Sequence, residues 1–169
     1  MFVIIDYDMG NLKSMSNALK ALDVPHEVSG DAQALASAEA IILPGVGAFG
    51  DGMRALERRG LVTVLHERVV RAGVPFLGVC LGMQFLAGRS YEHGEHAGLG
   101  WIPGNVVRIE PADRSLKVPH MGWNDLETVR ADSPLMRGVA DQTAVYFLHS
   151  YHFVPEERAA SAVVATTNH

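Results

Sequence analysis

The single cysteine of the chain, Cys80, lies in the pattern Gly-Val-Cys-Leu-Gly over residues 78–82. A G-x-C-x-G pattern between a predicted strand and a predicted helix matches a nucleophile elbow, with sulfur in place of the serine oxygen. Such a turn strains the backbone of the nucleophile, and side chains two residues to either side would collide. The spacing therefore favours a thiol presented for attack on a carbonyl carbon at the carboxyl edge of a sheet.

Two backbone N–H groups are candidates for stabilising the oxyanion of such a reaction. The Leu81 N–H would face an oxyanion formed at Cys80. The segment Pro44-Gly45-Val46-Gly47 follows a predicted buried strand, and its Val46 N–H is the second candidate donor. Simpler alternatives stay open, because the first pattern also fits a turn around a buried, inert cysteine and the second fits a plain tight turn.

The elements that must position these groups alternate between strand and helix in the first half of the chain. Strands are predicted at residues 2–6, 25–28, 40–43 and 74–79, and helices at 12–22, 51–71 with a break near Gly60, and 81–87. This alternation predicts an α/β fold with a mostly parallel central sheet and helices on both faces.

The second half of the chain reads as short strands and hairpins with few helices. Alternating apolar runs lie at residues 106–109, 116–118, 144–148 and 162–165. The last run ends close to His169, and a sheet finishing there would have an unpaired edge. We therefore expect one domain over residues 1–169 from which the C-terminal strands are missing.

Composition limits the classes of function. A chain of 169 residues fits one domain, and 48% hydrophobic with 20% charged residues is typical of a globular protein. The net charge of -5 argues against a nucleic-acid partner. One cysteine excludes an internal disulfide and fits a reducing, cytoplasmic location, and we recognise neither a signal peptide nor a membrane segment.

Six segments occur in an order that closely resembles the glutamine amidotransferase subunits of imidazole glycerol phosphate synthases. They lie at residues 4–7, 9–12, 43–49, 78–84, 119–124 and 146–151. The elbow alone indicates a class I, triad-type glutamine amidotransferase, and Pro-His-Met-Gly-Trp-Asn at 119–124 narrows the resemblance to this subunit. The resemblance implies a three-layer, flavodoxin-like fold and no cofactor or metal.

The resemblance also implies roles for particular residues. Cys80 would attack the side-chain amide of glutamine and form a thioester, with Val46 and Leu81 as oxyanion donors. The residues matching the glutamine-binding positions are Gly47, Gln84, Ser150 and Tyr151. The ammonia would pass to a cyclase subunit, a (βα)8 barrel, to give imidazole glycerol phosphate and aminoimidazole carboxamide ribotide in histidine biosynthesis. The residues matching the cyclase interface of this heterodimer are Gly10, Asn11, Met121, Trp123 and Tyr146.

One part of the family pattern is not found. The general base and its carboxylate belong to a late His-Pro-Glu motif that residues 1–169 do not contain. His152 with Glu156 has the wrong spacing, and His169 lies at a different point of the pattern. We expect the triad histidine and glutamate to be absent from this sequence. Asp8 also departs from the family, which often has glycine there.

Two other functional hypotheses remain. The chain could be a catalytically inactive module that docks on the cyclase, because it lacks the triad pair. It could be another elbow-cysteine hydrolase, such as a peptidase, although the 119–124 segment disfavours this. A zinc site at His93 and His96 is not expected, since neither a partner cysteine nor an H-E-x-x-H helix accompanies them. For the docking surface, the alternative is that Trp123 is buried in the core and is not exposed at an interface.

Overall fold

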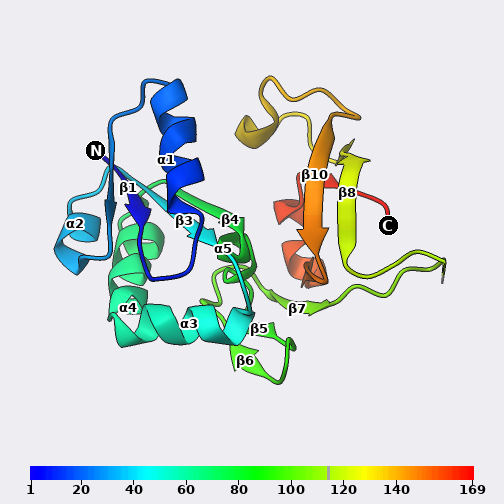
Figure 1. Ribbon diagram of the computed structural model, residues 1–169, viewed down its shortest axis with the longest axis horizontal. Helices are drawn as coiled ribbons and strands as arrows, with labels where there is room; N and C mark the ends of the chain where they lie inside the picture. Colours follow the sequence, from blue (N-terminus) through cyan, green and yellow to red (C-terminus); the bar gives the residue numbers. More distant parts are fainter. Residues whose placement is uncertain (114) are drawn as a thin grey trace.

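The computed structural model describes residues 1–113 and 115–169, and it has two halves joined near β7 (Figure 1). The N-terminal half holds a four-stranded parallel sheet in the order β2-β1-β3-β4. Its strands are β1 (Phe2–Ile5), β2 (His26–Ser29), β3 (Ala40–Gly45) and β4 (Phe76–Cys80). The predicted parallel α/β sheet is therefore confirmed.

Helices cover both faces of this sheet, since alternate strand residues point to opposite sides. They are α1 (Leu12–Ala21), α2 (Ala32–Ala36), α3 (Phe49–Arg58), α4 (Leu61–Leu65) with a π-helical continuation (His66–Arg71), and α5 (Leu81–Gln84). Ile5 and Leu43 pack in the larger core with α3 and α4. Ile4 and Ile42 face the other way, toward Leu19 of α1. None of the helices described is long and apolar enough to cross a bilayer.

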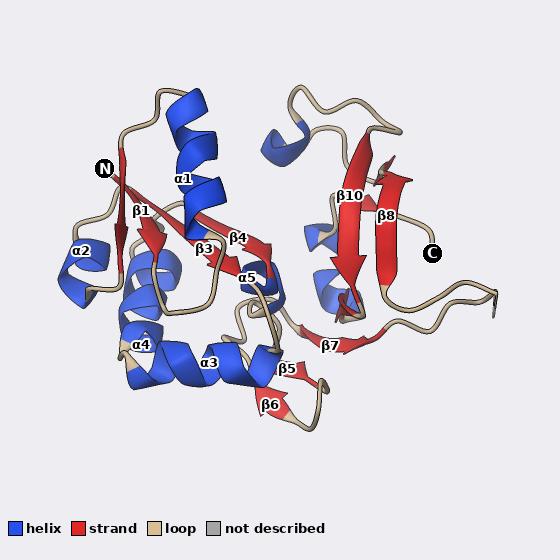
Figure 2. Ribbon diagram, in the orientation of Figure 1, coloured by secondary structure: helices blue, strands red, loops and turns tan. Residues whose placement is uncertain are grey.

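The C-terminal half consists of small sheets and short turns in place of long helices (Figure 2). One sheet has the order β11-β7-β5-β6, and two-stranded ribbons form from β8 with β10 and from β9 with β12. The bounds are β5 (Arg89–Ser90), β6 (His96–Ala97), β7 (Gly104–Arg108), β8 (His120–Asp125), β9 (Glu127–Thr128), β10 (Ala144–His149), β11 (Tyr151–Pro155) and β12 (Ala165–Thr166). Short 3-10 turns lie at Pro134–Met136 and Glu157–Ala162.

Several expected elements differ from the structure. The strand expected at 116–118 is wrong, because the backbone N–H groups of Ser115 and Leu116 bond to Asp113 and form a turn. Of the strand expected at 162–165, only Ala165 lies in a strand, because the preceding 3-10 turn continues to Ala162 and β12 begins at Ala165. The helix expected at 81–87 stops at Gln84, and α2, β8 and β11 were not predicted.

β3 runs further than its sequence suggests, through Pro44 to Gly45. Proline lacks an N–H and is normally confined to positions without a partner on one side. The pairing of β3 with β1 ends at Ile42, so Pro44 has β4 as its neighbour on one side only. This arrangement carries β3 up to the point where Gly45 stands opposite Cys80 in the sheet.

A tight turn after β1 is fixed by an ion pair. Asp8 has a φ of 71°, in the left-handed region that a residue with a side chain seldom adopts. Its carboxylate accepts a hydrogen bond from Nη2 of Arg59 at 2.7 Å and a second from Nε at 3.2 Å. Arg59 is the residue at the C-terminal cap of α3, so the pair links the turn to that helix.

Candidate active site

Cys80 stands at the junction of β4 and α5 in the geometry of a nucleophile elbow. Its φ of 55° and ψ of -114° are strained for a residue with a side chain, and its side chain is exposed. A Cβ on Gly82 would lie 1.8 Å from the Leu43 carbonyl oxygen, and one on Gly78 would lie 2.5 Å from the Gly82 carbonyl oxygen. The structure has the elbow geometry predicted from the glycine spacing, and the alternative of a buried cysteine is wrong.

A cavity of about 430 Å³ opens beside Cys80 and is lined by both halves of the chain. From the N-terminal half it is lined by Val46, Gly47, Cys80, Leu81, Gln84 and Glu92. From the C-terminal half it is lined by Pro119, Leu148, His149, Ser150 and Tyr151. The residues that the sequence suggested for the nucleophile, the oxyanion donors and the glutamine site thus all line one cavity.

Two backbone segments next to Cys80 carry the candidate oxyanion donors. Val46 directly follows β3, and Leu81 is the first residue of α5. Both residues line the cavity with Cys80. Backbone N–H groups at such a cavity are the groups that can stabilise a negative oxygen developing on a bound carbonyl.

Gln84 joins the elbow to the C-terminal half. This side chain is buried, and its Nε2 donates to the Tyr151 carbonyl oxygen at 3.0 Å. The bond uses one N–H of the amide and leaves its oxygen as an acceptor toward the cavity that Gln84 lines. Gln84 therefore also fixes Ser150 and Tyr151 relative to Cys80.

Glu92 is a cavity residue that the sequence analysis missed. Its Oε2 accepts a hydrogen bond from the Phe49 N–H at 2.7 Å, at the start of α3. The carboxylate brings negative charge into the cavity that Cys80 lines. Glu92 lies in a polar, glycine-containing loop, and only the folded chain brings that loop next to residues 43 positions away.

A chain of hydrogen bonds runs through two histidines behind the cavity. His149 Nδ1 lies 3.0 Å from the Tyr151 carbonyl oxygen, which can only accept, so Nδ1 is the protonated nitrogen. His149 Nε2 then accepts from Nδ1 of His120 at 3.2 Å, and His120 Nε2 accepts from Asn124 Nδ2 at 3.2 Å. Burial, followed by the neighbouring His169 and His149, lowers the pKa of His120 below its ordinary value, which favours the neutral ring that this chain requires.

None of the substitute triad residues lies beside Cys80 in the described structure. His152 does not line the cavity, and Glu156 accepts a hydrogen bond from Arg158 at 2.9 Å instead. His169 stacks on His120 with ring centroids 4.1 Å apart, and its Nε2 lies 2.9 Å from the Lys117 carbonyl oxygen. His149 is the one described histidine that lines the cavity, and both of its ring nitrogens are engaged.

The positions of the described side chains do not form a metal site with three or more histidine, cysteine or carboxylate ligands. No group of three histidine, cysteine, aspartate or glutamate side chains among them is arranged to hold a metal ion. The His96 ring instead packs over α3, where a Cβ on Gly50 would come within 2.6 Å of it. His93 lies at a ring-centroid distance of 6.4 Å from Tyr151.

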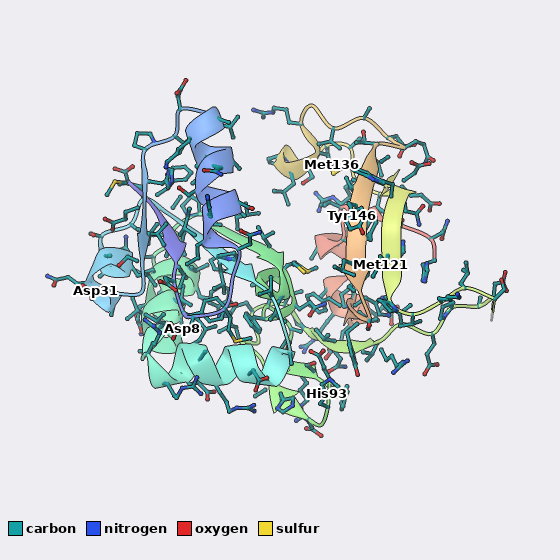
Figure 3. The ribbon with its side chains drawn as sticks, viewed as in Figure 1. Asp8, Asp31, His93, Met121, Met136 and Tyr146 are labelled. Carbon is teal, nitrogen blue, oxygen red and sulfur yellow. The ribbon has the colours of Figure 1, made fainter. Side chains whose placement is uncertain are left out.

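One face of the β8–β10 ribbon is apolar and exposed. Figure 3 labels Met121 on β8 and Tyr146 on β10, on neighbouring strands. The exposed fractions are 61% for Met121, 74% for Trp123, 55% for Tyr146 and 57% for Leu148, and we call these four residues the ribbon face. Trp123 and Tyr146 pack edge to face, with ring centroids 5.7 Å apart. The alternative of a core-filling Trp123 is therefore wrong.

The turn that contains Gly10 and Asn11 lies in the other half and packs along the end of β3. Asn11 is the N-cap of α1, and its side chain accepts from the Ser14 N–H at 3.1 Å. A Cβ on Gly10 would lie 3.1 Å from Cγ of Pro44, and one on Gly47 would lie 3.0 Å from Cε of Met9. The turn thus contacts the segment that carries Val46.

The fold agrees with comparisons to known proteins. A family model described as "Glutamine amidotransferase class-I" matches residues 3–169. A solved structure described as a glutamine amidotransferase superposes with a TM-score of 0.68 at 20% identity, over 92% of this chain and 75% of that one. The chain belongs to the class-I glutamine amidotransferase family.

Relatives of higher identity carry one particular name. The protein "Imidazole glycerol phosphate synthase subunit HisH" of Aquifex aeolicus is 46% identical over 168 residues, which span 99% of this chain and 78% of the relative. The protein of the same name from Lactiplantibacillus plantarum is 48% identical over 169 residues, 100% of this chain and 78% of the relative. The chain is thus similar to HisH subunits along its whole length.

Proposed function

We propose that this chain is the glutaminase subunit of an imidazole glycerol phosphate synthase and supplies ammonia to a cyclase subunit in histidine biosynthesis. The observation that carries the proposal is the single cavity in which the strained Cys80 elbow meets Val46, Leu81 and the Ser150–Tyr151 segment. The similarity to HisH subunits along the whole chain supports the choice of this synthase among glutamine amidotransferases.

In the proposed reaction, the Cys80 thiolate attacks the side-chain amide carbon of glutamine and forms a C–S bond. The amide oxygen becomes negative and accepts hydrogen bonds from the N–H groups of Val46 and Leu81. The C–N bond then breaks and the nitrogen takes a proton, which releases ammonia and leaves a glutamyl thioester. Water hydrolyses the thioester to glutamate and the free thiol, so the sum is glutamine plus water to glutamate plus ammonia.

The cavity offers groups of the right charge for the other end of glutamine. The Glu92 carboxylate fits the α-ammonium group of the substrate, because the two charges are opposite. The free side-chain oxygen of Gln84 and the backbone of Gly47, Ser150 and Tyr151 are the further polar groups that we assign to substrate binding. The Glu92 assignment adds to the set that the family resemblance implied.

The general base is the catalytic role that we assign to none of the described histidines. His149 lines the cavity, but its nitrogens bond to His120 and to the Tyr151 carbonyl. A base must be free to take a proton, and a carboxylate must orient it. The chain spans 78% of the length of each of the two relatives named above.

We assign the ribbon face and the turn at Gly10 and Asn11 to docking on the cyclase, a (βα)8 barrel. An exposed Trp, Met and Tyr cluster has the composition of an interface centre. Leu148 belongs to the ribbon face and also lines the cavity, so ammonia released at Cys80 would emerge beside the docked partner. The single cysteine supports a reducing, cytoplasmic setting.

A direct test uses the protein expressed from its complete open reading frame, with and without the cyclase. We expect glutamate to form from glutamine, faster with the cyclase, and a thiol-reactive glutamine analogue to label Cys80 once per chain. Cys80→Ser, which keeps the shape of the elbow, is the matched control and should neither turn over nor be labelled. Absence of both turnover and labelling in the wild-type complex would reject the glutaminase assignment.

The second candidate is a catalytically inactive module that docks on the cyclase. The engaged nitrogens of His149 favour it, because they leave no free histidine among the described residues that line the cavity. Tight binding to the cyclase without glutamine turnover would support this candidate over the first. Turnover of a peptide in place of glutamine would instead favour an elbow-cysteine peptidase.

A further inference from the structure

The Tyr7 hydroxyl is a buried polar group without a partner in the part of the chain described. Tyr7 is 0% exposed, and its Oη has no hydrogen-bond partner among residues 1–113 and 115–169. A buried, unpaired hydroxyl is costly, and phenylalanine would fill the same space without that cost. Its ring packs edge to face against Phe85 with centroids 6.2 Å apart, so the hydroxyl is held in place.

The hydroxyl lies against the end of β3, one residue before the candidate oxyanion donor Val46. A Cβ built on Gly45 would lie 2.7 Å from Tyr7 Oη. The same Cβ would lie 2.8 Å from Cβ of Leu81 and 2.9 Å from the backbone nitrogen of Gly82. The Tyr7 hydroxyl and the first turn of the elbow therefore converge on one side of Gly45.

Gly45 also stands at the point where the two parts of the oxyanion site meet. It is paired with Cys80 in the β3–β4 register, and the next residue along is Val46. Burial, and then the nearby Cys80, raise the pKa of Tyr7 above its ordinary value. The hydroxyl thus keeps its proton at neutral pH and can donate a hydrogen bond to a backbone carbonyl.

We propose that the Tyr7 hydroxyl is a positioning group of the oxyanion site, which hydrogen-bonds the backbone at Gly45–Val46 when the tetrahedral intermediate forms. The inference rests on the proposed glutaminase function. A small reorientation of the Gly45–Val46 peptide would give the Tyr7 hydroxyl a hydrogen-bond partner, which it lacks in the free chain. The bond then steadies the Val46 N–H in the state that holds the oxyanion, so Tyr7 acts through Val46 and does not touch glutamine.

The test compares Tyr7→Phe with the wild-type complex, using protein from the complete open reading frame and saturating cyclase. Tyr91→Phe is the matched control, since Tyr91 is exposed and does not line the cavity. The measurements are kcat and KM for glutamine, the melting temperature, and binding of glutamate γ-semialdehyde. The semialdehyde forms a C–S bond to Cys80 without a leaving group, so its oxygen occupies the oxyanion site.

For Tyr7→Phe we expect kcat to fall about tenfold or more with KM nearly unchanged, because the lost bond acts on the transition state. Semialdehyde binding should weaken by a similar factor, while glutamate binding and the melting temperature stay at or above wild-type values. Tyr91→Phe should match the wild type throughout.

Wild-type kcat and semialdehyde affinity in Tyr7→Phe would overturn the inference, and so would a raised KM with a lowered melting temperature, which marks a packing role. A wild-type complex that neither hydrolyses glutamine nor binds the semialdehyde would overturn the proposed function and the inference with it. The two failures are therefore distinguishable, because the first leaves the wild type fully active.

Discussion

The two halves of the molecule use apolar side chains in opposite ways. In the N-terminal half, Leu43, Leu56 and Phe85 are fully buried between the parallel sheet and its helices. Beyond residue 100, the buried apolar side chains of the described structure are Val106, Ile109, Met136 and Ala159. The C-terminal half instead exposes the ribbon face to solvent. The Cys80 elbow is thus built on a closed core, whereas the ribbon face beside it is open to solvent.

This contrast suggests that the N-terminal half holds the elbow rigid and that the C-terminal half provides the surface that contacts a partner. The elbow needs a strained cysteine to be held in place, and strain persists only where surrounding structure over-determines it. The ribbon face needs no such support, since large exposed apolar patches mark contacts with another molecule. Mutations in the two halves should therefore affect different measurements, and four predictions test that separation.

The largest expected effect is on catalysis alone. Cys80→Ala in the complex should lower glutaminase kcat by about 10⁴-fold or more, because the covalent intermediate cannot form. Since Cys80 is exposed, the melting temperature and the affinity for the cyclase should stay at wild-type values. Rates of glutamate formation, thermal melts and a binding titration are the measurements. A large loss of stability would mean that the elbow also holds the core together.

A matched pair of leucine truncations tests the difference in burial. Leu56→Ala should lower the free energy of unfolding by about 2–5 kcal/mol, since Leu56 is fully buried in the core of the N-terminal half. Leu148→Ala, on the ribbon face, should change it by about 0.5 kcal/mol or less. Urea unfolding of both variants measures the effect. Equal losses of unfolding free energy in the two variants would show that Leu148 is buried in solution, and would contradict the difference in burial between the two halves.

Trp123→Ala tests recognition. We expect it to weaken binding to the cyclase by about 2 kcal/mol, or about thirtyfold in Kd, because exposed tryptophans at interface centres dominate affinity. Folding stability should be preserved, since the side chain is 74% exposed. Leu22→Ala, an exposed apolar residue at the end of α1, is the control and should bind normally. A wild-type Kd for Trp123→Ala would remove the ribbon face from the interface.

The smallest expected effect is on the pH dependence of stability. The folded state lowers the pKa of His120, so its contribution is present above about pH 6.5 and is lost as the pH falls below that value. Stability falls because the unfolded chain takes up the proton first. His120→Gln should therefore lose less stability than the wild type between about pH 7.5 and about pH 5.5.

The control for this pH effect is His66→Gln, because His66 is exposed on the N-terminal half. Urea unfolding at the two pH values should give His66→Gln the wild-type pH dependence. His149 and His169 face His120 and remain in both variants. An unchanged acid loss in His120→Gln would assign the effect to those neighbours.

The elbow and the parallel sheet could be predicted because their signals are local. Glycines at 78 and 82 and the apolar strands before them constrain the backbone wherever the chain goes next. The residues that the family resemblance assigned to glutamine binding all line the cavity beside Cys80. Glu92 was missed because its contact with the Phe49 N–H depends on the approach of two distant loops.

The second half was harder to predict because its strands are short and only partly buried. Alternation at 116–118 resembles a strand, yet a local hydrogen bond to Asp113 is enough to form a turn there. The strand β8 was not predicted, since His120 and Asn124 interrupt its apolar pattern with polar groups. These groups find their partners only after folding, in the hydrogen-bond chain behind the cavity.

The ion pair between Asp8 and Arg59 couples two positions that lie far apart in the sequence, so substitutions at one should depend on the residue at the other. Asp8 holds a left-handed backbone that glycine would adopt without help, and Arg59 binds its carboxylate from the end of α3. Replacing Arg59 would leave Asp8 in an unfavourable conformation without its ion pair. Glycine at position 8 adopts that conformation unaided, so position 59 could then change without this cost. Among homologues, the two positions should therefore covary. Arginine at position 59 should be more frequent in sequences with a carboxylate at position 8 than in sequences with glycine there.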